Sequence, residues 1–155
     1  MPQDDIQQGL TISPQKAIAT ARREMGVGSC VAAQALRVSR INGDAEDYYL
    51  ILFGPSSGTT AVATIGAESY RMQSSAKLGG LRSHLSISAQ EAEDIVQSAH
   101  PIEDPSWRVA AVWKPSPASQ SPFYPLWQVS SRDMIYYVDQ QGKIWTELDS
   151  RQGRG

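Results

Sequence analysis

The 155-residue sequence predicts an α+β fold made of two related units, each a helix followed by an antiparallel meander of strands. Three observations predict it. A segment near the N-terminus recurs farther along the chain, apolar residues at helical spacing follow each copy, and short runs with strand periodicity follow each helix. A helix that covers one face of a meander is a common α+β layer arrangement, and we expect the two units to pack together.

The internal repeat is carried by residues 10–17 (LTISPQKA) and residues 85–92 (LSISAQEA), which share Leu, Ile, Ser, Gln and Ala at an offset of 75 positions. The same offset aligns two aromatic openings of apolar runs, residues 48–51 and 123–126, and a turn glycine recurs with one position of slip. This agreement predicts a duplicated unit. We therefore expect equal environments at the following pairs of positions: Ser13 and Ser88, Ile12 and Ile87, Ala17 and Ala92, Tyr49 and Tyr124.

The first helix is expected at residues 14–25. Ser13 is a favoured N-cap, and Pro14 suits the first helical position because its missing N–H would have no partner there. Gly26 can adopt the left-handed conformation that ends a helix. Apolar residues recur at helical spacing along one side: Ala17, Ile18, Ala21 and Met25.

Strand-forming runs follow this helix and are separated by turn residues. We expect strands at residues 31–40, 47–53, 60–65 and 69–73. The turns between them are Asn42-Gly43, the GPSSG segment at residues 54–58, and Gly66.

The second unit repeats this order. Ser88 and Glu91 have the spacing of a capping box, and Pro101 stops the helix, which we expect at residues 89–99. Strands are expected at residues 108–114, 123–129, 133–138 and 143–148, with a Pro- and Ser-rich loop at 115–121 and a turn at 139–142.

These elements place the first unit at residues 8–75 and the second at residues 83–149. Residues 74–82, which include two consecutive glycines, are the expected link. Residues 150–155 are polar and glycine-rich, which is typical of a flexible tail.

Composition excludes several classes of protein. Fourteen basic and sixteen acidic residues give a net charge of −2, which provides no field for nucleic acid. The apolar runs are too short for a membrane span, so a soluble protein is expected. The N-terminus has no basic start followed by an apolar run, so the sequence as given predicts a cytoplasmic protein, or an extracytoplasmic one if a signal was removed.

The second unit, and more loosely the first, resembles the PepSY family. The resemblance lies in ISAQEA at residues 87–92, YPLWQV at residues 124–129 and YYVDQQGKIW at residues 136–145. The first copy departs from the pattern because ATIG at residues 63–66 has no Asp before its glycine. The resemblance implies a tandem PepSY/cystatin-like layer arrangement and a role in binding or inhibiting peptidases, or in extracytoplasmic sensing.

No residue pattern indicates catalysis, a cofactor or a metal centre. The single cysteine, Cys30, cannot form an intramolecular disulfide, and we interpret it as a small, buried or half-buried apolar residue. The two histidines, His84 and His100, have no spacing typical of metal ligands or of a cysteine–histidine pair. The acidic residues at the start of the second helix are expected to be a solvated helix end: Glu91, Glu93 and Asp94.

All four tryptophans lie in the second unit, where alternation along the strands gathers aromatic side chains on one face. These side chains either fill the core or form an exposed surface that binds a peptide or a partner subunit. The candidate binding surface comprises Trp107, Trp113, Tyr124, Trp127, Tyr137 and Trp145.

The sequence therefore predicts a non-catalytic module that binds a protein or peptide, a peptidase inhibitor or regulator among the candidates, with aromatic and edge-strand surface as the contact. A homodimer is the alternative assembly. The alternative function is a small-molecule carrier or sensor with an apolar pocket between sheet and helix, lined by Trp113, Leu126 and Trp127.

Overall fold

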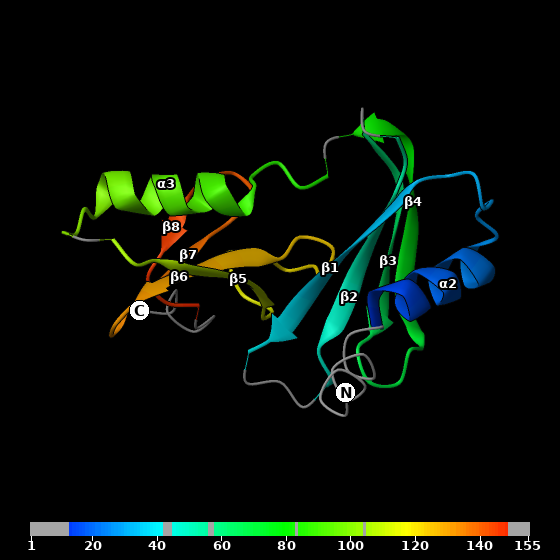
Figure 1. The fold of residues 1–155 in the computed structure, drawn as a ribbon, viewed down its shortest axis with the longest axis horizontal. Helices are drawn as coiled ribbons and strands as arrows, with labels where there is room; N and C mark the ends of the chain where they lie inside the picture. Colours follow the sequence, from blue (N-terminus) through cyan, green and yellow to red (C-terminus); the bar gives the residue numbers. More distant parts are fainter. Residues whose placement is uncertain (1–12, 42–44, 56–57, 83, 104, 149–155) are drawn as a thin grey trace, which may run out of the picture. The chain divides into compact units, whose positions relative to one another are not determined.

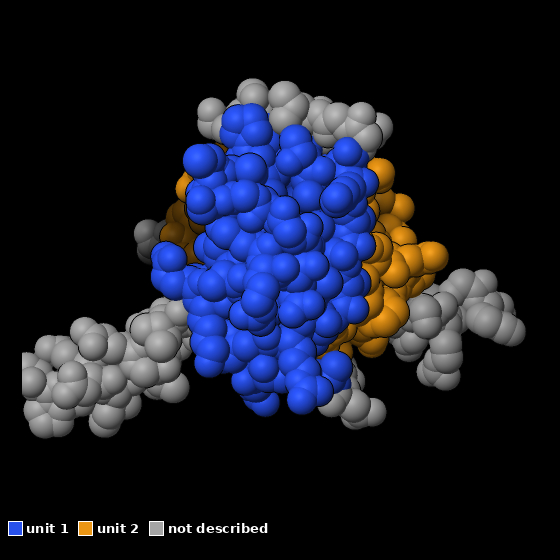
Figure 2. Space-filling model, turned by 90° about the vertical axis from the view of Figure 1, so that its right-hand side faces the viewer, with its two compact units in different colours: residues 1–37, 45–84 blue, residues 38–44, 85–155 orange. Residues whose placement is uncertain are grey.

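The computed structural model describes residues 13–41, 45–55, 58–82, 84–103 and 105–148 (Figure 1). The described residues form two helices and eight strands, an α+β fold with a mixed sheet, as the sequence predicts at this level. The chain divides into two compact units, coloured in Figure 2. Unit 1 is Met1–Arg37 with Ala45–His84, and unit 2 is Val38–Asp44 with Leu85–Gly155.

Unit 1 contains one helix and a strand series. Its elements are α2 (Ser13–Met25), β1 (Ala33–Arg40), β2 (Tyr48–Phe53), β3 (Thr59–Gly66) and β4 (Met72–Arg82). Strands β2, β3 and β4 are antiparallel neighbours, and α2 packs on them. Small residues on the helix, Ala17 and Ala21, are fully buried, because alanine lets the helix backbone approach the aromatic and aliphatic side chains of the sheet. Those side chains include Tyr49, Ile51, Phe53 and Ile65.

Unit 2 repeats the order of helix and strands. Its elements are α3 (Ala89–Ala99), β5 (Arg108–Trp113), β6 (Leu126–Ser131), β7 (Met134–Val138) and β8 (Ile144–Trp145). The four strands form an antiparallel meander, and α3 packs on β5, β6 and β7 through the buried residues Ala92 and Val96. The last three residues of β1, 38–40, fall in unit 2, and two of them, Ser39 and Arg40, pair in parallel with β5.

Hydrogen bonding links the strands in the order β4-β3-β2-β1-β5-β6-β7-β8, so the ends of this series are β4 and β8. The parallel pair makes the sheet mixed, which the sequence does not predict. Antiparallel neighbours joined by short turns leave a local signal, whereas a parallel pair joins segments far apart in the chain and leaves none.

Both predicted helices are confirmed. Helix α3 has the predicted bounds, and its capping box forms: Glu91 N donates to Ser88 Oγ (3.1 Å) and Ser88 N donates to a Glu91 carboxylate oxygen (2.8 Å). Helix α2 begins one residue before its predicted start and ends as predicted, followed by Gly26 at φ 68°.

The expected link at residues 74–82 is wrong, because these residues belong to β4. Serine and glycine are weak strand formers, but pairing with the apolar strand β3 outweighs that preference. Strand β6 begins at Leu126, three residues after the predicted start, since Pro125 lacks the N–H that a ladder needs and the preceding residues form a turn in which Tyr124 N donates to the Ser121 carbonyl. Strand β8 has two residues instead of the expected six.

The two units share their order of elements, but only part of the positional match holds. Ala17 and Ala92 are both fully buried. Tyr49 is buried, whereas Tyr124 is 44% exposed, because Tyr124 lies in the loop before β6 and Tyr49 lies within β2. Ile12 lies outside the described residues, and Ile87 is half-buried.

Candidate binding sites

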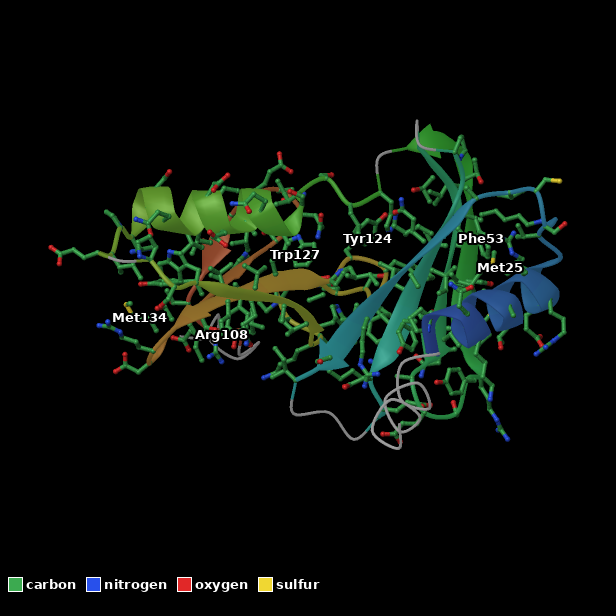
Figure 3. The ribbon with its side chains drawn as sticks, viewed as in Figure 1. Met25, Phe53, Arg108, Tyr124, Trp127 and Met134 are labelled. Carbon is green, nitrogen blue, oxygen red and sulfur yellow. The ribbon has the colours of Figure 1, made fainter. Side chains whose placement is uncertain are left out.

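The tryptophans of unit 2 are internal hydrogen-bond donors. Each indole N–H donates within the unit, to the following acceptors: Trp107 to Gln97 Oε1 (2.6 Å), Trp113 to Ser119 Oγ (3.2 Å), Trp127 to the Ile87 carbonyl (2.8 Å) and Trp145 to Asp139 Oδ2 (2.9 Å). Figure 3 shows Trp127 near the N-terminal end of α3, where Ile87 precedes the helix. A buried indole needs such a partner, so these side chains fix the architecture of the unit.

The six residues predicted as a binding surface differ widely in exposure. Trp113 and Trp127 are buried, with 6% and 8% of their surface accessible. Trp107, Tyr137 and Trp145 are half-buried, and Tyr124 is exposed. Burial is also why the pKa of Tyr137 is raised above its ordinary value. Of the six, Tyr124 therefore offers the most surface to a partner, and its binding role stays a prediction.

Tyr124 lines a cavity of about 310 Å³ in unit 2. The cavity lies between the loop that precedes β6 and the turn that follows β7. It is lined by Ala118, Ser119, Gln120, Ser121, Tyr124, Asp139, Gln140 and Gln141, and we call these residues the polar hollow. All of them except Ala118 and the ring of Tyr124 present polar side chains. The hollow is therefore a candidate site for a hydrogen-bonding ligand.

The indoles of Trp113 and Trp145 donate hydrogen bonds to two residues that line the polar hollow, Ser119 and Asp139. The Ser119 hydroxyl, which accepts from Trp113, in turn donates to the Tyr124 carbonyl (2.6 Å) and lies 3.1 Å from the Ser121 carbonyl. Asp139 is buried, and besides the Trp145 indole its carboxylate accepts from the backbone N–H groups of residues 141 (2.9 Å) and 143 (3.0 Å). The loop and the turn are therefore fixed in place before any ligand arrives.

Gln140 fixes the position of the turn against the start of α3. Its side-chain amide accepts from Ile87 N (3.2 Å) and donates to the Pro125 carbonyl (2.9 Å). Gly142, at φ 84°, brings the turn close to the same region, because a Cβ at this position would lie 3.6 Å from Ile95 Cδ1. The turn after β7 is thus hydrogen-bonded both to the segment before α3 and to the segment before β6.

A second cavity, of about 350 Å³, is lined by Ile102, Glu103, Ser131, Arg132 and Met134. Elsewhere in unit 2 the ring of His100 stacks on Tyr136 with centroids 4.4 Å apart, and the Trp107 ring meets Tyr136 edge-on at 6.1 Å. Neither cavity is lined by Trp113, Leu126 or Trp127.

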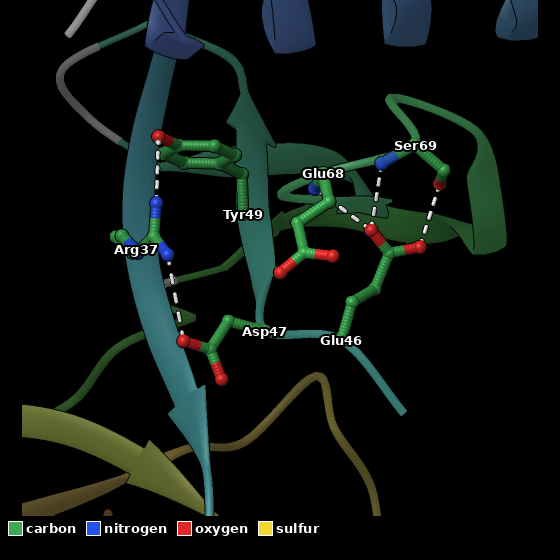
Figure 4. Close-up of polar contacts among 6 residues, drawn as sticks. All are labelled: Arg37, Glu46, Asp47, Tyr49, Glu68 and Ser69. Carbon is green, nitrogen blue, oxygen red and sulfur yellow. Dashed lines mark hydrogen bonds and ion pairs between the residues drawn. The ribbon is translucent and has the colours of Figure 1, made fainter. Parts of the chain in front are cut away.

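Unit 1 carries a polar network at the start of β2 (Figure 4). Arg37 donates to the Tyr49 hydroxyl (3.4 Å) and forms an ion pair with Asp47 (3.4 Å). The hydrogen bond to Tyr49 is the largest cause of the raised pKa of Arg37. Glu46 accepts from the N–H groups of Glu68 and Ser69 (both 2.7 Å) and from the Ser69 hydroxyl (2.6 Å). These bonds fasten the β3–β4 turn, which is a structural role.

The edge of β4 is the second candidate surface. Strand β4 ends the strand order, so one side of its backbone has no neighbouring strand among the described residues. Gln73, Ser75 and Lys77 are exposed, and the residues between them are half-buried. An eleven-residue edge of this kind can accept a further strand.

No family model, curated protein or solved structure matches this chain. In the part of the chain that the structure describes, no helix has the length and apolar character needed to cross a membrane. Within the same residues, no three His, Cys, Asp or Glu side chains gather into a group that could hold a metal ion.

Sequence reasoning identified Tyr124 but not the other residues of the hollow. The segments that carry them, residues 115–121 and 139–142, are recognisable as a loop and a turn, and loops often carry function. Their convergence depends on the β5–β6–β7 meander, which brings the loop before β6 beside the turn after β7. No local pattern contains that information.

Proposed function

We propose that this chain is a non-catalytic binding module that captures an extended segment of another protein along the edge of β4. The observation that carries the proposal is the position of β4, an eleven-residue strand, at the end of the strand order. Addition of a peptide strand to such an edge is a recurrent mode of recognition, in which main-chain hydrogen bonds supply much of the affinity.

The register identifies the backbone groups that a peptide would meet. Gly66 N donates to the Arg71 carbonyl and Ala67 N donates to the Asp47 carbonyl, so along β3 the groups of even-numbered residues point toward β4. Thr64 and Val62 therefore bond to their partners, residues 74 and 76. The N–H and C=O groups of Ser75 and Lys77 point to the open side of β4.

The centre of β4 contains neither a proline nor a bulge, and its one charged residue, Lys77, disfavours pairing with a basic or neutral strand more than with an acidic one. The strand contains no proline, and the two irregularities of its register lie toward its ends, between Thr59 and Ala61 and between Thr64 and Ile65 on β3. Natural edges are usually blunted by proline, bulges or charged side chains, lysine especially. The regular stretch at residues 74–77 fits a docking strand.

Charge selects the class of segment. Lys77 is exposed at the centre of the edge and Arg71 is exposed just before the strand, and neither forms an ion pair within the described residues. An acidic segment with alternating small apolar residues complements this edge. The PepSY resemblance supports a peptidase, or a peptide that a peptidase would take, as the source of the segment.

The test is binding of a fluorescent peptide of alternating glutamate and valine, measured by anisotropy. Ser75→Pro removes an outward N–H without removing a bond to β3, so we expect a retained fold and at least about tenfold weaker binding. Ser75→Ala is the matched control and should bind as the wild type does. Lys77→Glu should weaken binding by repulsion, even if Ser75→Pro fails to fold.

Two further measurements test whether the captured segment belongs to a peptidase or to a second copy of this chain. Titration of a peptidase panel with the full chain should give stoichiometric loss of one activity if the segment belongs to a peptidase. Light scattering reports self-association, and a dimer that Ser75→Pro abolishes would assign the edge to a second copy and overturn the proposal. Peptide binding that is absent, or equal in Ser75→Pro and Ser75→Ala, would also overturn it.

A further inference from the structure

The polar hollow of unit 2 has features that the edge of β4 lacks, and they point to a different ligand. We propose that the hollow binds a neutral carbohydrate of one or two sugar rings. The proposal does not depend on peptide capture at β4. It rests on the charge, the hydrogen-bonding groups, the aromatic side chain and the rigidity of the residues that line the cavity.

The charge of the lining excludes acidic ligands. No lysine or arginine lines the cavity. Its one carboxylate, Asp139, is buried and already accepts three N–H groups, which compensate its charge. A phosphate or carboxylate ligand would find no cation there, and a cationic ligand would find a carboxylate whose acceptor sites are mostly used. A neutral polar ligand fits best.

The hydrogen-bonding groups suit hydroxyl groups in particular. Gln120 and Gln141 are exposed, and each side-chain amide places a donor beside an acceptor. Gln140 keeps one N–H and one acceptor site after its bonds to Ile87 and Pro125. Ser121 accepts from Phe123 N through its hydroxyl oxygen, which leaves the O–H able to donate. Two neighbouring sugar hydroxyls can each donate and accept, so they match such amide groups.

Tyr124 supplies the apolar element of the site. Tyr124 lines the cavity and is 44% exposed, and among the described residues only Ile135 is another exposed large apolar residue. One face of a pyranose ring carries C–H groups and no hydroxyls, and it packs on an aromatic ring.

The hollow is also rigid before binding. The Trp113 indole donates to Ser119, and the Trp145 indole donates to Asp139. The Gln140 side chain links the backbone just before α3 to the backbone just before β6. A site whose groups are already ordered loses less entropy on binding. A cavity of about 310 Å³ lies at the small end of ligand sites and accommodates one ring fully, with a second ring at its mouth.

The experiment is saturation-transfer NMR and calorimetry on the full chain, with glucose, galactose, N-acetylglucosamine and cellobiose as probes. Glucose 6-phosphate and glucuronic acid are the charged comparisons. We expect saturable binding of at least one neutral sugar and at least about tenfold weaker binding of its charged analogue.

Variants assign the binding to the hollow. Tyr124→Ala and Gln141→Leu should each weaken binding by at least about fivefold, whereas Tyr124→Phe should retain it because the ring face remains. Both residues are exposed, so the fold should persist. Gln15→Leu, at an exposed glutamine on α2, is the matched control and should have no effect.

Three results would overturn the proposal. The first is the absence of saturable binding by every neutral sugar tested. The second is equal affinity in the wild type, Tyr124→Ala and Gln141→Leu, which would place the sugar elsewhere. The third is displacement of the bound sugar by the glutamate–valine peptide, with the same dependence on Tyr124, which would assign the hollow to peptide recognition.

Discussion

The indole of Trp127 anchors the segment that leads into α3, because its N–H reaches the Ile87 carbonyl from a strand forty residues later in the sequence. The neighbouring amide of the same residue, Ile87 N, is bound by Gln140. One residue at the helix entry is thus held from two sides by side chains of the sheet and its turn. Loss of either bond would leave a polar backbone group without its partner.

Trp127→Phe should reduce the free energy of unfolding by about 1–3 kcal/mol, through the lost hydrogen bond and the smaller ring in a buried site. Trp107→Phe is the control. Trp107 is half-buried and its acceptor is the side chain of Gln97, which can turn to water, so a loss below about 1 kcal/mol is expected. Urea unfolding followed by circular dichroism measures both. A larger loss for Trp107→Phe would contradict this account.

Tyr137 should make the protein less stable in alkali. Burial raises the pKa of its phenol in the folded state above 10.0. Below pH 10 both states hold the proton, so stability is unaffected there. As the pH rises past the pKa of the unfolded state, the unfolded chain ionises first and stability falls until the folded pKa is passed.

The comparison is between wild type and Tyr137→Phe in urea titrations from neutral pH to above pH 10. Tyr137→Phe should have the shallower loss of stability in the alkaline range, because it lacks the phenol that the folded state keeps protonated. Equal slopes would show that Tyr137 ionises alike in both states.

At the scale of elements, α3 carries its start signal in its own sequence. Ser88 and Glu91 satisfy each other's backbone N–H groups, and Glu91 also lies in the first turn, where negative charge is favourable. Ser88→Ala should therefore lower the free energy of unfolding by about 1 kcal/mol. Ser98→Ala, on the exposed side of the same helix, is the control and should be neutral. Thermal melts measure the stability of both variants. Equal shifts of the melting temperature in the two would refute the capping role of Ser88.

Some elements of this fold can be predicted from the sequence, and others cannot. The helices were predictable because caps, prolines and periodic alanines act within a few residues of one another. Strand β4 was not, since its central serines and glycines become strand only through pairing with β3, where Thr64 Oγ1 and Ser74 Oγ lie 2.6 Å apart. The parallel pair of β1 with β5 was not predictable for the same reason. Local composition favours turns, and tertiary pairing overrides it.

The candidate sites show the same division. Aromatic content points to unit 2, but the expectation that alternation along its strands gathers the aromatic side chains on one face is wrong. Trp127 lies opposite Ala111 and Val138, whereas Trp145 lies opposite Tyr137 on the other face of the sheet. Alternation also did not reveal that Trp113 and Trp145 serve the hollow through their N–H groups, because that depends on where Ser119 and Asp139 lie. The amides of residues 140 and 141 were visible in the sequence only as turn residues.

At the scale of the molecule, one order of elements occurs twice: a helix followed by four strands. The helices of both copies bury alanines at equal positions, Ala17 and Ala92, which preserves close helix–sheet packing. The surfaces of the two units differ. The first unit ends in a long edge strand, whereas the second ends in a strand of two residues and carries the polar hollow. Both differences lie at the ends of the sheet and in loops, the parts of a fold that vary most readily.

Cys30 is the single cysteine of the chain, so thiol labelling measures how accessible this one side chain is in solution. Cys30 was interpreted from sequence as a buried or half-buried apolar residue, and that interpretation is wrong, because the side chain is exposed in the turn after α2. Native protein should react with a chromogenic disulfide reagent at one thiol per chain, and about as fast as denatured protein. Mild oxidation should produce covalent dimers and no larger species, since a chain with a single thiol can bridge only once. Cys30→Ser should abolish both results, and slow labelling that denaturant accelerates would show that the turn buries the thiol.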